Sequence, residues 1–306
     1  MSTERTGAKR VSLILLAAIG AAVLLAVGMQ SALQKNQLFQ WFLAIKTAVS
    51  PPVIQGVPSQ LRANEFGQLV HDQGKRPVAR PDITDRTMVA FAFGQSNAAN
   101  HGGERHASAS GRVYNHFAGQ YFMAADPLLG GSGYFGSVWT LLADQLIDAG
   151  LHDRIVLLTA GVGDSSVKDW QPGGRLHGML RQRLEQTQKS GLVVTHFLWH
   201  QGEADHDADP TEYAAALNRV IDVARGYFPQ ATFFVAQASR CDGRPSSPAI
   251  LAAQRGIARR PGVFLGANTD AIDDADRYDG CHFSGRGLAR HAQQWLQALR
   301  TPKQAE

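Results

Sequence analysis

Short apolar runs and amphipathic segments alternate along the chain from about residue 87 onward. Apolar runs of strand length fall at 87–93, 154–160, 192–199, 231–237 and 262–266. Amphipathic segments with helical spacing lie at 137–149, 174–189, 210–227, 247–259 and 284–300. Strands separated by helices of this length require right-handed crossovers, which place parallel strands side by side. The pattern therefore predicts an α/β fold over residues 86–301: a three-layer α/β/α sandwich around a five-stranded parallel sheet.

The N-terminus follows a different pattern. Residues 11–29 carry no charge, and at about 1.5 Å per residue a helix of this length spans roughly the 30 Å hydrocarbon core of a bilayer. Arg5, Lys9 and Arg10 precede this run, and the positive-inside rule keeps that end in the cytoplasm. We therefore expect a cytoplasmic tail at 1–10 and a single-pass transmembrane signal anchor at 11–30. This places the chain in the inner (cytoplasmic) membrane, with its main domain in the periplasm or outside the cell.

A cleaved signal peptide is the alternative for this segment. Such peptides usually have an apolar core of about 7–15 residues that ends at a small-x-small site. The run here is longer and its exit offers no clean site of that kind, so an uncleaved anchor is favoured. Under both interpretations, the rest of the chain is exported from the cytoplasm.

Residues 31–85 are expected to connect the anchor to the domain. Within them, 37–49 have helical spacing, which suits either an amphipathic helix at the membrane interface or a helix packed on the domain. Five prolines between residues 50 and 85 indicate an extended linker.

Composition narrows the functional classes. Hydrophobic residues make up 44% of the chain and charged residues 18%, which is typical of a globular protein. The net charge of +4 comes from scattered rather than clustered lysines and arginines, so no nucleic-acid partner is expected. The two cysteines, Cys241 and Cys281, either form a disulfide outside the cytoplasm or remain buried thiols.

Chemistry-bearing residues follow four of the predicted strands. Ligands bind beyond the carboxyl ends of strands in open parallel sheets, so residues just after each strand are candidates for a site. The four segments are GQSN at 94–97, GVGDSSVKDW at 161–170, WHQGEAD at 199–205 and DGCH at 279–282.

These segments contain the groups that acyl transfer requires. A serine hydroxyl such as Ser96 needs a neighbouring base, and imidazole is the usual one. Asp279 lies three residues before His282, so one loop can present a base together with the carboxylate that fixes its tautomer. Tight glycine turns and a neutral amide supply donors for the negative charge of the intermediate.

The four motifs together resemble the SGNH hydrolases, whose fold is flavodoxin-like. The branch they resemble most contains the sialate O-acetylesterases and the acetylxylan esterases of carbohydrate esterase family six. The resemblance implies Ser96 as nucleophile, His282 as general base and acid, and Asp279 as its orienting carboxylate. It implies an oxyanion hole made by the backbone N–H groups of Ser96 and Gly163 and the side chain of Gln201. Gln95, Asn97 and Glu203 would support the site, with Glu203 bracing the pocket or assisting His282.

The implied function is that of a membrane-anchored serine esterase that deacetylates an O-acetylated carbohydrate or envelope polysaccharide. No cofactor and no metal are required. Departures from the family pattern bear on the acyl pocket, because Ala98, Ala99 and Asn100 follow GQSN and Asp164 replaces a common glycine. Two alternatives remain open: an envelope polysaccharide O-acetyltransferase, and a non-catalytic glycan-binding domain.

Three other motifs are interpreted as unrelated to function. The G-x-G-x-x-G at 131–136 is not preceded by a strand, so it is expected to be a loop rather than a dinucleotide site. The acidic and histidine residues at 200–209 lack metal-ligand spacing. No G-x-S-x-G surrounds Ser96, which argues against an α/β-hydrolase elbow.

Overall fold

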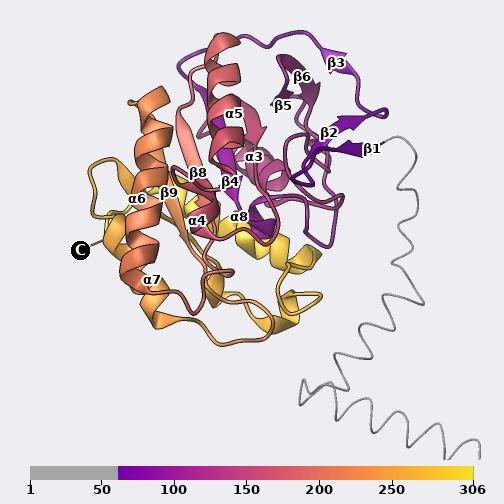
Figure 1. Ribbon diagram of the computed structural model, residues 1–306. Helices are drawn as coiled ribbons and strands as arrows, with labels where there is room; N and C mark the ends of the chain where they lie inside the picture. Colours follow the sequence, from indigo (N-terminus) through magenta and orange to yellow (C-terminus); the bar gives the residue numbers. More distant parts are fainter. Residues whose placement is uncertain (1–60, 306) are drawn as a thin grey trace, which may run out of the picture. The chain divides into compact units, whose positions relative to one another are not determined.

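The computed structural model describes residues 61–305 (Figure 1). The predicted anchor at 11–30 and the amphipathic segment at 37–49 lie outside the described residues. Within 61–305, none of the helices is both long and apolar enough to cross a bilayer.

An eight-stranded mixed sheet forms the centre of the domain. Its order is β10-β9-β8-β4-β7-β5-β6-β3. The strands are β3 (Pro77–Val78), β4 (Thr87–Gly94), β5 (Val113–Phe117), β6 (Gln120–Met123), β7 (Arg154–Thr159), β8 (His196–His200), β9 (Thr232–Gln237) and β10 (Val263–Asn268). The strands from β10 to β5 are parallel, whereas β6 and β3 are antiparallel to their neighbours. A separate hairpin pairs β1 (Leu61–Ala63) with β2 (Leu69–Asp72).

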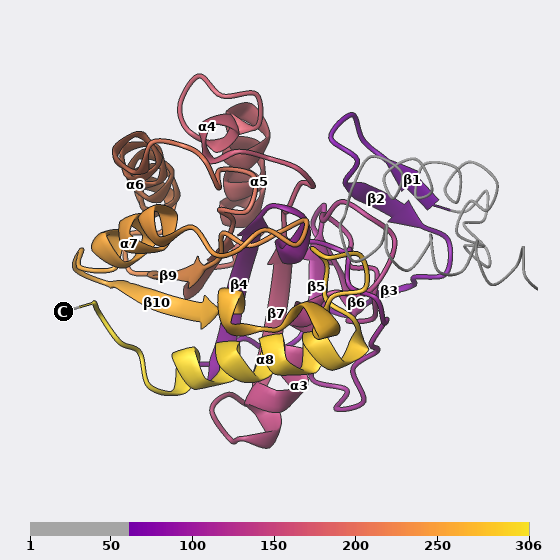
Figure 2. The same ribbon diagram turned by 90° about the horizontal axis from the view of Figure 1, so that it is seen from below.

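Helices cover both faces of the sheet (Figure 2). One face is covered by α4 (Val167–Trp170), α5 (His177–Lys189), α6 (Pro210–Tyr227) and α7 (Pro248–Ile257). The other is covered by α3 (Val138–Asp148) and α8 (Gly285–Arg300). Side chains of a strand alternate between its two faces, and in β4 Phe91 and Phe93 enter the first core while Ala90 and Ala92 enter the second. The predicted three-layer α/β/α sandwich is therefore present.

The sheet is larger than the five parallel strands predicted. All five predicted strands exist, but β5 adds a sixth parallel strand, and β6 and β3 extend the sheet further. The sequence of β5 places Asn115 at a fully buried position, where a predicted core strand would have an apolar residue. Its side chain donates to the carbonyl oxygens of Leu129 and Leu157 and accepts from the N–H of Leu129. These hydrogen bonds satisfy the polar groups of the buried amide.

The described part of the predicted linker also differs from expectation. Between residues 61 and 85 the chain forms β1, β2 and β3, and β3 pairs with β6 at the edge of the main sheet. Pro77 is tolerated there because an edge strand does not need every backbone donor. The folded domain thus extends N-terminal to residue 86, which was the predicted boundary.

Strand order fixes where a ligand can bind. Among the five predicted strands, β4 lies between β7 and β8, which is the flavodoxin-like order 2-1-3-4-5. Crossovers leave β4 in opposite directions at this point, and a crevice opens at the carboxyl ends of the strands. Gly94 ends β4 with φ +127°, and a Cβ there would lie 2.0 Å from the carbonyl oxygen of His200. Only glycine allows this close approach of β4 to β8.

Candidate active site

A pocket of about 450 Å³ lies beyond the carboxyl ends of the central strands. Its walls combine residues from four loops, although these are far apart in sequence. The lining residues are Gln95, Ser96, His101, Gly163, Asp164, Cys241, Asp242, Asp279, Cys281 and His282. A larger hollow of about 620 Å³ beside α7 and Lys303 contains no serine, cysteine, histidine or carboxylate. The smaller pocket therefore holds the chemistry predicted from sequence.

Ser96 occupies the turn that follows β4. It is the first residue of the short 3₁₀-helix η1 (Ser96–Ala98), so its N–H points out of the helix without an intrahelical partner. The residue is 6% exposed and its hydroxyl borders the pocket. The turn thus presents one hydroxyl and one backbone donor to the same space.

Asp279 and His282 form the predicted pair. Nδ1 of His282 lies 2.6 Å from Oδ2 of Asp279. The other oxygen, Oδ1, accepts the N–H groups of Cys281 at 2.9 Å and His282 at 2.7 Å. Burial opposes the charged form of Asp279, but the hydrogen bond from His282 and these N–H groups outweigh it and lower the pKa of Asp279. An ionised Asp279 keeps the proton of His282 on Nδ1 and leaves Nε2 as a base.

Nε2 of His282 is buried and has no hydrogen-bond partner among the described residues. Ser96 and His282 line one pocket without a hydrogen bond between them in this structure. In free enzymes such contacts are commonly long and tighten when substrate binds.

Two aromatic rings hold the His282 imidazole in place. The ring of His101 stacks on it with centroids 5.2 Å apart, and the ring of Tyr278 stacks at 5.9 Å. The hydroxyl of Tyr278 donates to the carbonyl oxygen of His101 at 2.9 Å. Sequence reasoning missed both residues. The only signal in the sequence was that His101 lies close to GQSN and Tyr278 close to DGCH. Nothing in the spacing of these motifs indicates that their two loops meet.

His101 also connects to the predicted oxyanion hole. The N–H of Gly163 donates to Oγ of Ser132 at 2.8 Å, and the same hydroxyl lies 3.1 Å from Nε2 of His101. Burial, followed by the nearby His282, lowers the pKa of His101 to about 4, so its ring is neutral near pH 7. Ser132 belongs to the glycine-rich segment 131–136, which is a loop as predicted. In this structure the Ser132 hydroxyl therefore accepts the hydrogen bond of the Gly163 N–H, which is the donor that was expected to face the oxyanion.

Gln201 differs from its predicted role. Its side chain is fully buried, and Nε2 donates to the carbonyl oxygen of Ser165 at 3.1 Å and to the carboxylate of Asp205. Both N–H bonds of the amide are thus committed within the protein. The strand-end position was correct, but spacing does not show toward which layer a side chain turns.

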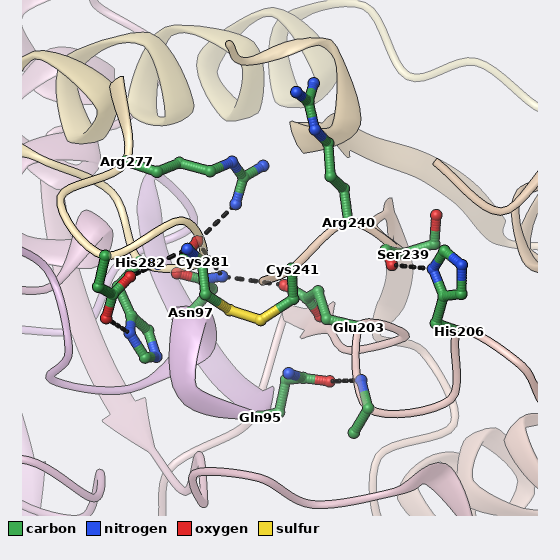
Figure 3. Close-up of a disulfide and its surroundings, with 12 residues drawn as sticks. Gln95, Asn97, Glu203, His206, Ser239, Arg240, Cys241, Arg277, Cys281 and His282 are labelled. Carbon is green, nitrogen blue, oxygen red and sulfur yellow. Dashed lines mark hydrogen bonds and ion pairs between the residues drawn. A yellow bond between two sulfur atoms is a disulfide. The ribbon is translucent and has the colours of Figure 1, made fainter. Parts of the chain in front are cut away.

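Gln95 is the amide that borders the pocket. Its Oε1 accepts the N–H groups of Ala204 at 3.0 Å and Gly202 at 3.3 Å, which fixes the side chain (Figure 3). No hydrogen bond to a described residue uses its Nε2. This orientation leaves an amide donor beside Ser96, where Gln201 had been expected to provide one.

A buried polar row supports the turn that carries Ser96. Oε1 of Glu203 accepts from Nδ2 of Asn97 at 3.0 Å and lies 2.9 Å from Nε2 of His200. Nδ1 of His200 lies 3.1 Å from Nε2 of His291. Glu203 therefore braces the pocket through Asn97, one of the two roles predicted, and its contact is with His200 rather than His282. Despite burial, the charge of His200 and the hydrogen bonds lower the pKa of Glu203 to about 2.

A disulfide joins Cys241 to Cys281, which settles the alternative left open by the sequence. It ties the loop after β9 to the loop that carries Asp279 and His282 (Figure 3). Arg277 adds to this support, because its guanidinium donates to the carbonyl oxygens of Cys281 at 2.5 Å and Thr269 at 2.8 Å. The loop that carries Asp279 and His282 is thus held covalently and by hydrogen bonds.

No group of three or more metal-ligating side chains within the described range is arranged to bind an ion. The residues at 200–209 instead make separate contacts. His206, for example, bonds the carbonyl oxygen of Ser239 at 2.9 Å.

Comparison with known proteins agrees with this geometry. Residues 87–300 match the sequence profile of the carbohydrate esterases described as sialic acid-specific acetylesterases. The chain belongs to this family. The predicted SGNH-type, sialate O-acetylesterase-like family is therefore confirmed, and carboxylic ester hydrolysis is the class of reaction that the family performs.

Individual relatives are more distant. A probable carbohydrate esterase of Arabidopsis thaliana is 32% identical over 71 residues, which span 22% of this chain and 26% of that protein. A solved Arabidopsis thaliana structure matches with a TM-score of 0.58 at 18% identity, covering 70% of this chain and 98% of that one. A carbohydrate acetylesterase of Xanthomonas citri matches with a TM-score of 0.49 at 17% identity, covering 70% of this chain and 56% of that one. The Arabidopsis structure supports the fold, whereas the activity of this carbohydrate esterase must be argued from its own site.

Proposed function

We propose that this carbohydrate esterase is a serine O-acetylesterase that hydrolyses acetyl esters of a carbohydrate through Ser96, His282 and Asp279. One observation carries the proposal. A histidine whose Nδ1 is held by a carboxylate at 2.6 Å lines the same pocket as a strand-end serine, and its Nε2 is left without a partner. This is the arrangement in which a serine hydroxyl can be activated.

The reaction proceeds in two steps. Ser96 Oγ attacks the acetyl carbonyl carbon while His282 Nε2 takes the hydroxyl proton. His282 then returns this proton to the sugar oxygen, whose bond to the acetyl carbon breaks. Water, deprotonated by His282, attacks the acetyl-serine, and acetate leaves as Ser96 regains its proton. Asp279 remains ionised throughout and stabilises the imidazolium.

Negative charge on the tetrahedral intermediate requires donors. Ser96 and Gln95 line the pocket, and the N–H of Ser96 and Nε2 of Gln95 have no partner among the described residues. The N–H of Gly163 becomes a third donor when the Ser132 hydroxyl rotates away. Loss of one such donor typically lowers kcat by about 10²–10³.

Acetate release by the full-length chain tests the proposal. The wild type should hydrolyse acetyl esters of sugars, and Ser96→Ala should reduce the rate by several orders of magnitude. Ser190→Ala is a matched control, because Ser190 caps the C-terminus of α5, which leads into the amino end of β8, away from the carboxyl ends where the pocket lies. Equal, background rates in the wild type and Ser96→Ala would reject an esterase. Acetyl transfer to added glycan that outpaces acetate release would identify a transferase.

We further propose that residues 11–30 anchor the protein in the inner membrane, with the esterase domain on the exported side. The support is the uncharged run and the basic residues before it. The full chain should remain with membranes after alkaline carbonate washing, and a chain that begins at residue 31 should not. Release of the full chain by the wash would reject the anchor.

A further inference from the structure

The pocket carries an unbalanced negative charge. Three of its lining residues are aspartates, and none is lysine or arginine. Asp279 is paired with His282, but Asp164 and Asp242 are exposed and make no ion pair or side-chain hydrogen bond with any described residue. His101 does not compensate, because its pKa of about 4 leaves it neutral near pH 7.

The two unpaired carboxylates are held on fixed backbone. Asp164 follows Gly163 with φ +55°, and Asp242 follows Cys241 with φ +54°, a region that aspartate tolerates better than most residues. The disulfide fixes Cys241, and the N–H of Gly243 donates to the carbonyl oxygen of Gly280 at 3.3 Å. The turn that presents Asp242 is therefore docked on the loop that contains Asp279 and His282.

Basic residues near these loops are engaged elsewhere. Arg240 pairs with Asp274 at 2.9 Å, and Arg244 pairs with Asp207. Lys168, beyond the turn of Asp164, pairs with Glu212 at 2.5 Å. These cations are matched by their own carboxylates, so the charge at the mouth of the pocket remains negative.

An exposed aromatic ring accompanies this charge. Tyr278 is 52% exposed although it stacks on His282 and is fixed through its hydroxyl. An exposed ring of this kind offers a flat apolar face beside the reacting centre, and it attracts a cation over that face.

From these observations we propose that this pocket departs from the sialic acid specificity in the family's description: it selects acetyl esters of uncharged or amino-bearing sugars and repels those of acidic sugars, such as sialic and uronic acids. The inference rests on the proposed esterase function and names its class of substrate. An anionic sugar would bring its carboxylate toward Asp164 and Asp242 without any cation to receive it. An ammonium group on the sugar would be attracted by the same two side chains.

The expected effect is moderate. Charges at the rim of a solvated pocket interact through a high effective dielectric, so each carboxylate should change the relative kcat/KM of oppositely charged substrates by about three- to tenfold. Salt should reduce the preference, because exposed charges are screened over about 10 Å at 0.1 M ionic strength.

Three matched acetyl esters test the proposal: a neutral hexose, the corresponding hexosamine with a free amine, and the corresponding hexuronic acid. The wild type should show the highest kcat/KM for the amine, then the neutral sugar, then the acid. The double variant Asp164→Asn/Asp242→Asn should compress this series toward equality, since asparagine keeps the shape and tolerates the same φ. Asp148→Asn is the matched control, because Asp148 is exposed at the end of α3, which leads into the amino end of β7, away from the pocket.

The inference can fail separately from the proposed function. Hydrolysis of all three esters at equal rates, a preference for the acid, or an unchanged series in the double variant would overturn the charge selection while leaving the esterase intact. Binding of the three sugars to Ser96→Ala protein provides a readout without turnover. The same order in that assay would support charge selection even if no ester were hydrolysed.

Discussion

Nε1 of Trp295 donates a hydrogen bond to Nε2 of His291 over 2.9 Å, in a region where both side chains are fully buried. An indole N–H can only donate, so Nε2 of His291 must accept. His200 Nδ1, which contacts the same nitrogen, must then carry a proton. Since Nε2 of His200 faces the carboxylate of Glu203, one further proton is shared between those two groups. The indole thus leaves His200 and Glu203 as a buried pair joined by that proton beneath the Ser96 turn.

Glu203→Gln should therefore destabilise the fold. The amide oxygen could still accept from Asn97, but the buried acceptor that faces His200 would lose its negative charge. Removal of one partner from a buried pair typically costs about 3–5 kcal/mol. Urea denaturation should show a loss of this size, whereas Glu185→Gln, in an exposed pair with Arg181, should change stability by less than about 1 kcal/mol. Equal stability of the two variants would contradict a stabilising role for the buried His200–Glu203 pair.

Asp279→Asn should abolish most activity without unfolding the loop. The amide oxygen can still accept the N–H groups of Cys281 and His282, so the loop geometry persists. The amide N–H₂ would face Nδ1, however, and favour the wrong tautomer of His282. The expected fall in kcat is about 10³–10⁴, with little change in KM. Retention of activity within tenfold would remove Asp279 from the proposed triad.

Ser132→Ala tests whether the Gly163 N–H serves the reaction. Without the hydroxyl, that N–H has no internal acceptor and is free for the oxyanion. We expect kcat/KM to stay near the wild-type value or rise by up to about tenfold, in the same acetate-release assay. A fall of 100-fold or more would instead assign Ser132 to holding His101 and Gly163 in place.

The disulfide should contribute substantially to stability. It closes a sequence separation of 40 residues, for which chain entropy predicts about 4 kcal/mol, and typical measured values are about 2–4 kcal/mol. The double variant Cys241→Ser/Cys281→Ser should lose this amount in urea denaturation. A reductant should destabilise the wild type and leave the double variant unaffected. Equal destabilisation of both proteins by the reductant would show that the disulfide is not the source of this stability.

Stability should fall as pH is lowered below about 6.5. Burial is the main reason that the pKa values of His101, His116 and His196 fall to about 4 in the folded protein. In the unfolded chain, histidines titrate near 6.5. Between these values the unfolded chain binds more protons than the native one, so the free energy of unfolding rises with pH in this window and its loss is complete near pH 4.

His116→Phe should reduce the slope of that dependence. His116 is 3% exposed and its Nε2 has no hydrogen-bond partner among residues 61–305, so phenylalanine removes a titrating group at a site that suits an apolar ring. The slope of unfolding free energy against pH should decrease by up to about 1.4 kcal/mol per pH unit between pH 6 and 5. An unchanged slope would show that titrating groups other than His116 cause the pH dependence of stability.

Much of this arrangement was predictable because burial has a simple sequence pattern. The five strands and five long helices follow apolar periodicity, and the positions of Ser96, Asp279 and His282 follow from strand ends. β5 escaped prediction because its core position is filled by Asn115, whose hydrogen bonds come from distant backbone.

The remaining differences arise from contacts between distant segments. His101 meets His282, and Ser132 meets His101, only after three loops have folded together, and no local spacing encodes those encounters. Gln201 shows the complementary difficulty. Its place in the sequence was correct, yet the buried carboxylate of Asp205 draws its amide inward, away from the pocket.

The long sequence separation between Ser96 and His282 has a consequence for the chain during its synthesis. A ribosome that has added the first 250 residues has produced the proposed nucleophile Ser96 and most of the sheet, but neither the proposed base His282 nor Cys281. Trp295, which sets the protons beneath the Ser96 turn, is added later still. Because domains of this size fold as units, the proposed site can form only after residue 295 has been added, and a product truncated before residue 282 should lack esterase activity.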